Sequence, residues 1–351
     1  MSQSHFDNDA DHDHTHEHDH KHTRGLQGWL LELFSPHEHG HYATALDPAM
    51  ANARGIWAVK VSLIALLVTA VFQLFIVAIS GSVALLADTI HNFSDALTAI
   101  PLWIAFTLAR RPRNDRYTYG YGRAEDLAGV LIVVMIFLSA IEVFQQSIDK
   151  IVHPQPVTNL SWVATAAIIG FIGNEAVAIF RTRIGREIGS AALIADGLHA
   201  RTDGFTSPGV LVGVIGVALG LPLADPLIGI VIGVAILIVV WNTAQDMWYR
   251  LMDAVDPVVS RSIVETPLRI PGVLAVRNAT VCWLGHRQRA ELSINVADDL
   301  SVVQSHQIAE VVRHDLFHAL PALSAVIVHV DPEGHEFHSL TAHHQAGAPP
   351  S

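Results

Sequence analysis

Two nine-residue segments of the chain repeat one pattern of ionisable side chains, and each lies inside a long apolar stretch. They are ADTIHNFSD at Ala87–Asp95 and ADGLHARTD at Ala195–Asp203. In each copy Asp, His and Asp fall at i, i+3 and i+7, which places all three on one face of an α-helix. Ionisable groups in a lipid-buried helix are costly, so they normally face the protein interior and mark an ion pathway. Two such faces would supply nitrogen and oxygen ligands for a divalent transition metal, and the repeat therefore predicts metal transport.

The composition is that of a membrane protein and argues against several other classes. Of the 351 residues 51% are hydrophobic, and the net charge is -12. The acidic balance argues against nucleic acid as a partner. The one cysteine, Cys282, excludes a disulfide framework within the chain and a site of several thiolates. No H-E-x-x-H motif occurs, so a membrane metalloprotease has no support, and we predict that the chain is not an enzyme.

Six apolar stretches are each long enough to cross a bilayer, which takes about 20 residues. They lie at Ile56–Ser80, Val83–Leu108, Glu125–Ile148, Leu160–Phe180, Ala191–Leu219 and Pro226–Met247. Six such stretches joined by short loops are not expected of a soluble protein. The chain is therefore predicted to be a polytopic α-helical membrane protein with six transmembrane helices.

Arginines indicate the orientation of these helices, because cytoplasmic loops carry an excess of Lys and Arg. The loops after the second and fourth stretches are predicted to hold Arg110, Arg111, Arg113, Arg116, Arg123, Arg181, Arg183 and Arg186. Both termini are then cytoplasmic, and we expect a multi-pass protein of the cell inner membrane. The second and fifth helices run antiparallel, and Asp95 and His199 each fall roughly 8–12 residues into their helix, near the midplane. A midplane site between repeats is what alternating access requires.

The two ends of the chain are polar and rich in histidine. Ten of the 22 histidines fall within residues 1–42, mostly in the run DHDHTHEHDHKH at Asp11–His22. Strict alternation of His with acids has no apolar period, so residues 1–54 are predicted to be a disordered cytoplasmic segment. We interpret it as a weak collector of metal; the alternative is a tail without a metal role. Residues 333–351, with four further histidines, are predicted to be a disordered tail.

After a transmembrane domain at residues 55–250, the periodicity becomes that of a small soluble domain at residues 251–332. We predict helix, strand, strand, helix and strand, in that order, at Val259–Arg269, Leu274–Trp283, Arg289–Val296, Ser301–Leu320 and Ser324–Asp331. Ser301 and Gln304 have the spacing of a capping box. This order predicts a C-terminal cytoplasmic α+β domain of ferredoxin-like type.

Over about Gly55–Pro332 the chain resembles a known family, the cation diffusion facilitators. The motifs that carry the resemblance are HNFSD, HARTD, YGYGRAEDLAG, GNEAVA and VHVDP, which begin at His91, His199, Tyr119, Gly173 and Val328. The resemblance implies a zinc/proton exchanger that works as a homodimer and exports metal from the cytoplasm. Carried over position by position, it implies a tetrahedral transport site formed by His91, Asp95, His199 and Asp203.

Two imidazoles and two carboxylates form a ligand set that suits Zn²⁺. Without a thiolate Cu⁺ is disfavoured, and Mg²⁺ and Ca²⁺ prefer more oxygen ligands. Cd²⁺, Co²⁺, Ni²⁺, Fe²⁺ and Mn²⁺ remain alternatives to zinc as the transported substrate. Imidazole binds metal only when neutral, so protons would compete for both histidines and act as the counter-substrate.

The chain departs from the family pattern at two other metal sites. A second site in the loop before the third span would use an Asp and two His, but Asn114, Tyr117 and Tyr121 stand there, and we predict no metal. In the cytoplasmic domain His306, His329 and Asp331 match the family's binuclear site, and they are candidate ligands. The histidines expected beside them are replaced by Arg277 and Ser293, so the site is eroded.

Several charged residues are expected to support the site rather than to bind metal. Asp88 and Asp196 stand one turn before each histidine, where they could orient the imidazole or bond to another span. Arg201 projects away from the ligand face and should pair with Glu175 or Glu142. By resemblance to the family, Arg123 and Asp253 form an ion pair that joins the spans to the cytoplasmic domain; the alternative is a solvated surface pair.

Other histidines receive plainer interpretations, and two other functions stay open. His286 is assigned to a hairpin turn, and His314 and His318 share a helix face, a spacing that allows a metal pair but that we interpret as solvated. A membrane-anchored metal sensor without transport is the main alternative function, although it does not explain ligands at mid-membrane on two antiparallel spans. A channel is the second alternative, but four convergent ligands favour occlusion of the ion.

Overall fold

The computed structural model describes residues 48–80, 89, 93, 96–97, 99–152, 160–218 and 223–333. Apart from Glu333, the predicted tail at 333–351 lies outside these residues, as does most of the predicted N-terminal segment at 1–54. The helices of the apolar part are α2 (Pro48–Ser80), α4 (Ala99–Ala109), α5 (Ala124–Val152), α6 (Leu160–Ile188), α7 (Ala191–Ala218) and α8 (Ala224–Leu251). The soluble part holds α9 (Pro257–Leu268), β1 (Ala275–Leu284), β2 (Arg287–Val296), α10 (Val302–Ala319) and β3 (Leu323–Pro332).

Four of the described helices are long and apolar enough to cross a membrane. They cover Met50–Ile79, Ala124–Val152, Ala164–Ile188 and Ala224–Leu251. Helix α4 is a shorter apolar helix at the end of the predicted second span, and the part of that span before Ala99 lies mostly outside the described residues. Helix α7 has 28 residues, and its first half carries the charged residues Asp196, Arg201 and Asp203. A helical transmembrane domain is therefore confirmed, whereas the number of six spans stays a prediction.

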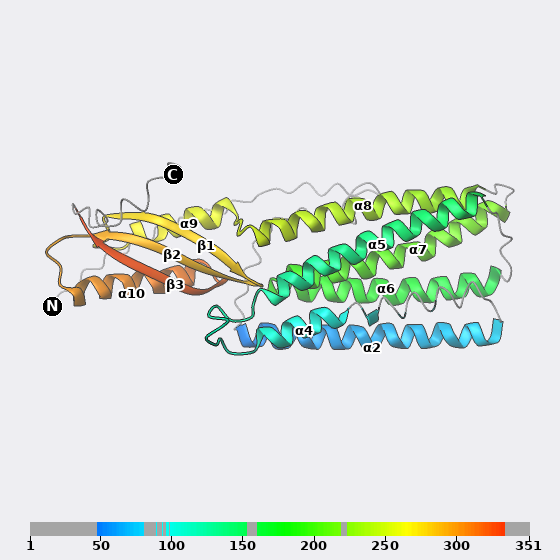
Figure 1. The fold of residues 1–351 in the computed structure, drawn as a ribbon, viewed down its shortest axis with the longest axis horizontal. Coiled ribbons are helices and arrows are strands. Elements are labelled where there is room, and N and C mark those ends of the chain that lie inside the picture. The colour runs from blue at the N-terminus through cyan, green and yellow to red at the C-terminus, as the bar shows by residue number, and fades with distance from the viewer. Residues whose placement is uncertain are drawn as a thin grey trace, which may run out of the picture. The chain divides into compact units, whose positions relative to one another are not determined.

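The apolar helices pack in pairs, with α6 against α7, α5 against α8 and α2 against α6 (Figure 1). Their shared core includes Leu102, Phe106, Ile132, Ile136 and Leu193, all fully buried. Many large apolar side chains on the outer faces of α2, α5 and α8 are exposed. A helix that is apolar on its outer as well as its inner face is expected where lipid replaces water.

Helices α6 and α7 approach each other closely at Gly197. A Cβ atom at Gly197 would lie 2.5 Å from Thr182 Oγ1 and 3.0 Å from the Thr182 backbone nitrogen. Only a residue without a side chain fits at that separation. The close contact holds the part of α7 that carries the HARTD motif against α6, which is the packing that small residues allow between membrane helices.

The end of α6 corrects one sequence interpretation. Arg181, Arg183 and Arg186 were expected in a loop after Phe180, but α6 continues to Ile188 and carries all three. Arg181 is 1% exposed and faces the interior, so it gives no evidence about orientation. The buried side chain of Arg181 has an anionic partner on α7, which makes its burial tolerable and which hydropathy alone does not reveal.

The soluble part is the predicted α+β domain. Its sheet has the strand order β1-β2-β3, with β1 and β2 antiparallel and β2 and β3 parallel. The capping box forms at the start of α10, where the Ser301 side chain accepts from Gln304 N and the Gln304 side chain accepts from Ser301 N. The helices cover a core that includes Ile263, Leu292, Ile294, Val312 and Leu316. Element order and type agree with the sequence prediction, with bounds shifted by one or two residues.

Candidate functional site in helix α7

Asp196, His199 and Asp203 of the second motif lie on one buried face of α7. Asp196 is 0% exposed, His199 2% and Asp203 6%. His199 Nδ1 and Asp203 Oδ2 are 3.5 Å apart, as expected for an i, i+4 pair on one helix face. An imidazole nitrogen and a carboxylate oxygen therefore converge inside the helical part, and this pair can ligate a borderline divalent metal.

The first motif falls outside the described residues. His91, Asp95 and Asp88 belong to the gap between α2 and α4, in which only Thr89, Phe93 and 96–97 are described. The convergence of all four expected ligands thus stays a prediction.

Asp196 forms a buried ion pair with Arg181 of α6. Arg181 Nη1 and Asp196 Oδ2 are 3.0 Å apart, with side chains 1% and 0% exposed. Arg181 Nε also donates to Ser62 Oγ at 2.8 Å, so α2, α6 and α7 meet at this group. The contact is a bond to another span, one of the two roles expected of Asp196; its role in orienting His199 stays a prediction.

Arg181 is the residue of this group that sequence reasoning missed. A signal for it was present, because Asn174, Ala178, Arg181 and Gly185 recur every three or four residues along α6. That period is typical of one helix face packed against a neighbour. Asn174, Ala178 and Arg181 are all buried in the structure.

Arg201 is directed away from the ligand face, as predicted, and it pairs with Glu175 of α6. Arg201 Nη2 donates to Glu175 Oε1 at 2.9 Å, and Arg201 Nε donates to Glu175 Oε2 at 3.3 Å. The two parallel bonds form the bidentate arrangement that guanidinium and carboxylate favour. A second charged pair therefore joins α6 to α7, and the cation is neutralised away from the candidate ligands His199 and Asp203.

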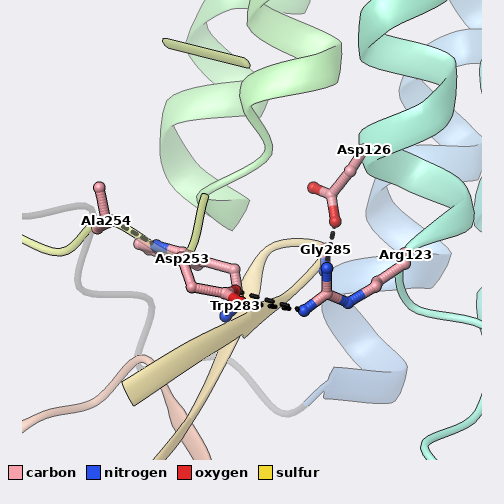
Figure 2. A network of polar contacts seen from close by, with 6 residues as sticks. All are labelled: Arg123, Asp126, Asp253, Ala254, Trp283 and Gly285. Carbon is pink, nitrogen blue, oxygen red and sulfur yellow. Dashed lines mark hydrogen bonds and ion pairs between the residues drawn. The ribbon is translucent and has the colours of Figure 1, made fainter. Parts of the chain in front are cut away.

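Arg123 and Asp253 join the start of α5 to the segment after α8 (Figure 2). Arg123 Nη2 lies 3.2 Å from Asp253 Oδ2, and the two side chains are 50% and 34% exposed. Asp253 Oδ1 also accepts from the backbone N–H of Trp283 on β1 at 2.8 Å. The indole of Trp283 in turn donates to Ala254 O at 2.8 Å. The carboxylate of Asp253 thus links the membrane helices to the sheet.

The turn between β1 and β2 is bound to the same end of the helices. Gly285 N donates to Asp126 Oδ2 at 3.2 Å (Figure 2). His286 Nδ1 lies 2.7 Å from Glu125 Oε2, and the two side chains are only 4% and 2% exposed. Arg250 of α8 donates to Gly285 O and to Gly189 O, each at 2.8 Å. The interpretation of His286 as a plain turn residue missed this partner, which is 161 residues away in the sequence.

Gly285 has a φ of +66°, which favours glycine in this turn. A Cβ atom there would also lie 2.7 Å from Gly122 O, so the turn and the start of α5 are in direct contact.

The candidate cytoplasmic ligands are only partly brought together. His329 Nε2 and Asp331 Oδ1 are 3.0 Å apart on β3, whereas His306 lies on the exposed face of α10. Ser293 is the β2 neighbour of His329, and Arg277 on β1 pairs with Ser293. Within the described ranges no group of three or more His, Cys, Asp or Glu side chains is placed to hold a metal ion.

The positions of the family's loop site form a polar turn. Asn114 Oδ1 accepts from the backbone N–H groups of Arg116 and Tyr117 at 3.0 and 2.8 Å. Asn114 Nδ2 donates to the Tyr121 hydroxyl at 2.8 Å, and the rings of Tyr117 and Tyr121 are 4.6 Å apart between centroids. The amide and the two phenols are thus engaged with one another.

Comparison with known proteins matches both parts of the chain. A family model described as the cation efflux transmembrane domain covers residues 59–252, and one described as the cation efflux protein cytoplasmic domain covers residues 255–333. A probable cation efflux system protein of Mycobacterium tuberculosis is 50% identical over 313 residues, which is 89% of this chain and 94% of the relative. The manganese efflux system protein MneS of Bacillus subtilis is 24% identical over 272 residues, which is 78% of this chain and 93% of the relative.

Among solved structures, the cadmium form of a MamM C-terminal domain variant is 27% identical over 22% of this chain and 96% of that domain, with a TM-score of 0.22.

Proposed function

Because this chain belongs to the cation diffusion facilitator family of cation efflux transporters, we propose that it exports zinc from the cytoplasm in exchange for protons. The family is one of transporters rather than enzymes, and the chain is a membrane protein. The proposed transport site consists of His91, Asp95, His199 and Asp203. The observation that carries the proposal is the buried His199–Asp203 pair of α7, with ligand atoms 3.5 Å apart.

Ligand chemistry supports zinc as the first choice of substrate. Two imidazoles and two carboxylates suit four-coordinate Zn²⁺ at about 2.0–2.2 Å. Cd²⁺, Co²⁺, Ni²⁺, Fe²⁺ and Mn²⁺ accept the same ligand types, and affinity order alone does not separate them. One relative is named a manganese efflux system protein, so a competition series should include Mn²⁺.

Exchange with protons follows from the chemistry of imidazole. A metal binds only the neutral ring, so each metal ion that enters from the cytoplasm displaces protons from the site. When the site opens to a more acidic exterior, protonation of His199 and His91 expels the metal. The buried pair Arg181–Asp196 and the partly buried pair Arg201–Glu175 would hold α7 on α6 during this cycle, because each joins the two helices directly.

We further propose a homodimer in the cell inner membrane with both termini in the cytoplasm. The matched family model of residues 255–333 describes a cytoplasmic domain, which supports this side for the sheet and its helices. The exposed arginines Arg110, Arg111 and Arg113 between α4 and α5 favour the same side by the positive-inside rule.

The test is zinc uptake into proteoliposomes whose lumen is more acidic than the outside. Wild type is compared with Asp203→Asn, which removes the ligand charge at constant size. A matched control is Glu265→Gln, which removes one charge from an exposed side chain of α9. We expect uptake by wild type and the control, and loss of uptake in Asp203→Asn. Zinc binding without flux in all three proteins would contradict transport and favour a metal sensor.

A further inference from the structure

Helix α10 carries two histidines one turn apart, and the nitrogens at the tips of their rings face each other. His314 Nε2 and His318 Nε2 are 3.1 Å apart, and the ring centroids are 4.4 Å apart. The i, i+4 spacing puts both rings on one helix face. The buried face of α10 is a different one, made by Ala309, Val312 and Leu316.

The separation of the two nitrogens is close to that of two ligands on one metal ion. A divalent zinc-like ion binds imidazole nitrogen at about 2.0–2.1 Å, and a tetrahedral angle then places two such nitrogens about 3.3 Å apart. The observed distance of 3.1 Å is close to this value, and a small rotation of either side chain would make up the difference.

A carboxylate next to the pair favours one tautomer of the neutral His314 ring. Its Nδ1 lies 3.1 Å from Asp315 Oδ1. A carboxylate accepts a hydrogen bond, so it favours the proton on Nδ1 and leaves the lone pair on Nε2, directed at His318. The neutral ring of His318 can carry its own proton on Nδ1, which leaves its Nε2 free for a metal as well.

The surroundings of the pair allow an ion to enter and favour a positive charge. The side chain of His314 is 68% exposed and that of Asp315 is 46% exposed, so water can complete the coordination. His318 lies in the last turn of α10, where the helix dipole presents its negative end. The nearest cation along the helix, Arg313, is paired with Glu310.

We propose that His314 and His318 form a surface binding site for a divalent transition ion of the zinc, copper, nickel or cobalt class, oriented by Asp315 and completed by water. The site uses none of the transport ligands and none of the candidate cytoplasmic ligands His306, His329 and Asp331. With two protein ligands it binds reversibly, and it holds the end of α10 closed while the ion is bound.

The test is hydrogen exchange of the full-length protein in detergent, measured by mass spectrometry on peptides from α10 with and without ZnCl₂. Bound metal slows opening of the helix end by the factor 1 + [Zn]/Kd. Exchange of the last-turn amides should therefore slow about ten-fold when free zinc is ten times Kd. The peptide readout is local, so zinc bound by the polar ends of the chain or by α7 does not produce it.

Two variants decide the result. His318→Gln removes one ligand, and His318→Ala combined with Ala319→His keeps the number of histidines but turns one ring about 100° around the helix. Both should exchange like wild type without zinc, and neither should slow when zinc is added. The proposal is overturned if wild type shows no protection up to about a millimolar zinc, or if the relocated histidine gives the same protection. Loss of zinc transport in Asp203→Asn would leave this result unchanged, so the two proposals fail separately.

Discussion

Substituting Asn for Asp196 should strongly destabilise the helical part, because the Arg181 guanidinium then stays buried without its counter-ion. The two side chains are 1% and 0% exposed, and Arg181 Nη1 lies 3.0 Å from Asp196 Oδ2. The bond from Arg181 Nε to Ser62 Oγ remains, but a hydroxyl cannot balance the charge. Arg181→Met should have a similar effect, because it leaves the carboxylate of Asp196 alone.

The magnitude follows from the separation of the charges. At about 4 Å between charge centres and an effective dielectric constant near 20, the attraction is about 4 kcal/mol. Removing one member of a buried pair costs about 3–5 kcal/mol in the free energy of unfolding, because the remaining charge is uncompensated. Removing both charges in the double variant should cost well under the sum, with a coupling energy of about 2 kcal/mol or more.

The assay is equilibrium unfolding of the detergent-solubilised protein, followed by the fluorescence of its seven tryptophans. Wild type, Asp196→Asn, Arg181→Met and the double variant complete one thermodynamic cycle. Glu187→Gln is the matched control, because its carboxylate lies near the end of the same helix and is exposed, paired with Arg54. The reasoning is refuted if the single variants unfold within about 1 kcal/mol of wild type, or if the double variant costs as much as both singles together.

Three further results are expected. Gly197→Val should lower the free energy of unfolding by about 1–3 kcal/mol or more, because the valine Cβ would lie 3.0 Å from the Thr182 backbone nitrogen. An unchanged unfolding midpoint would contradict the close packing of α6 and α7. Asp253→Ala should destabilise the protein more than Arg123→Ala, since the carboxylate also accepts from Trp283 N, and equal effects in thermal unfolding would oppose this. Burial, with the nearby Asp253 carboxylate, raises the pKa of the Cys282 thiol, so its reaction with maleimide should be slow at pH 7 and faster at higher pH. Asp253→Asn should lower that pKa and speed the reaction, and a rate equal to that of wild type would count against the assignment.

Local signals in the sequence predicted much of the fold and of α7. The spacing of Asp196, His199 and Asp203 placed them on one face, and that face is buried. The direction of Arg201, about half a turn from the candidate ligands, predicted a partner on another span, either Glu175 or Glu142, and the structure shows Glu175. The capping box at Ser301 was predictable because its two partners, Ser301 and Gln304, are three residues apart in the sequence. Each of these features depends on helical periodicity alone.

Two contacts between separate elements of the fold were not predicted. Arg181 was assigned to a loop, because a cation after an apolar run normally marks the end of a span, and its partner on α7 lies across a turn. His286 was assigned to a plain turn, although it contacts Glu125 at 2.7 Å. No spacing rule relates His286 and Glu125, which are 161 residues apart, and the contact of Arg181 with Asp196 depends on how the chain turns back between α6 and α7.

The central claim is that metal and protons exchange through the site that includes His199 and Asp203. Its most direct test records zinc flux and lumenal pH together in vesicles that contain wild-type protein, with an imposed pH gradient. The account predicts that zinc entry is accompanied by proton exit, that dissipating the gradient with an ionophore stops zinc accumulation, and that Asp203→Asn abolishes both fluxes. Zinc accumulation that persists without the gradient, or coupled fluxes of wild-type size in Asp203→Asn, would contradict it.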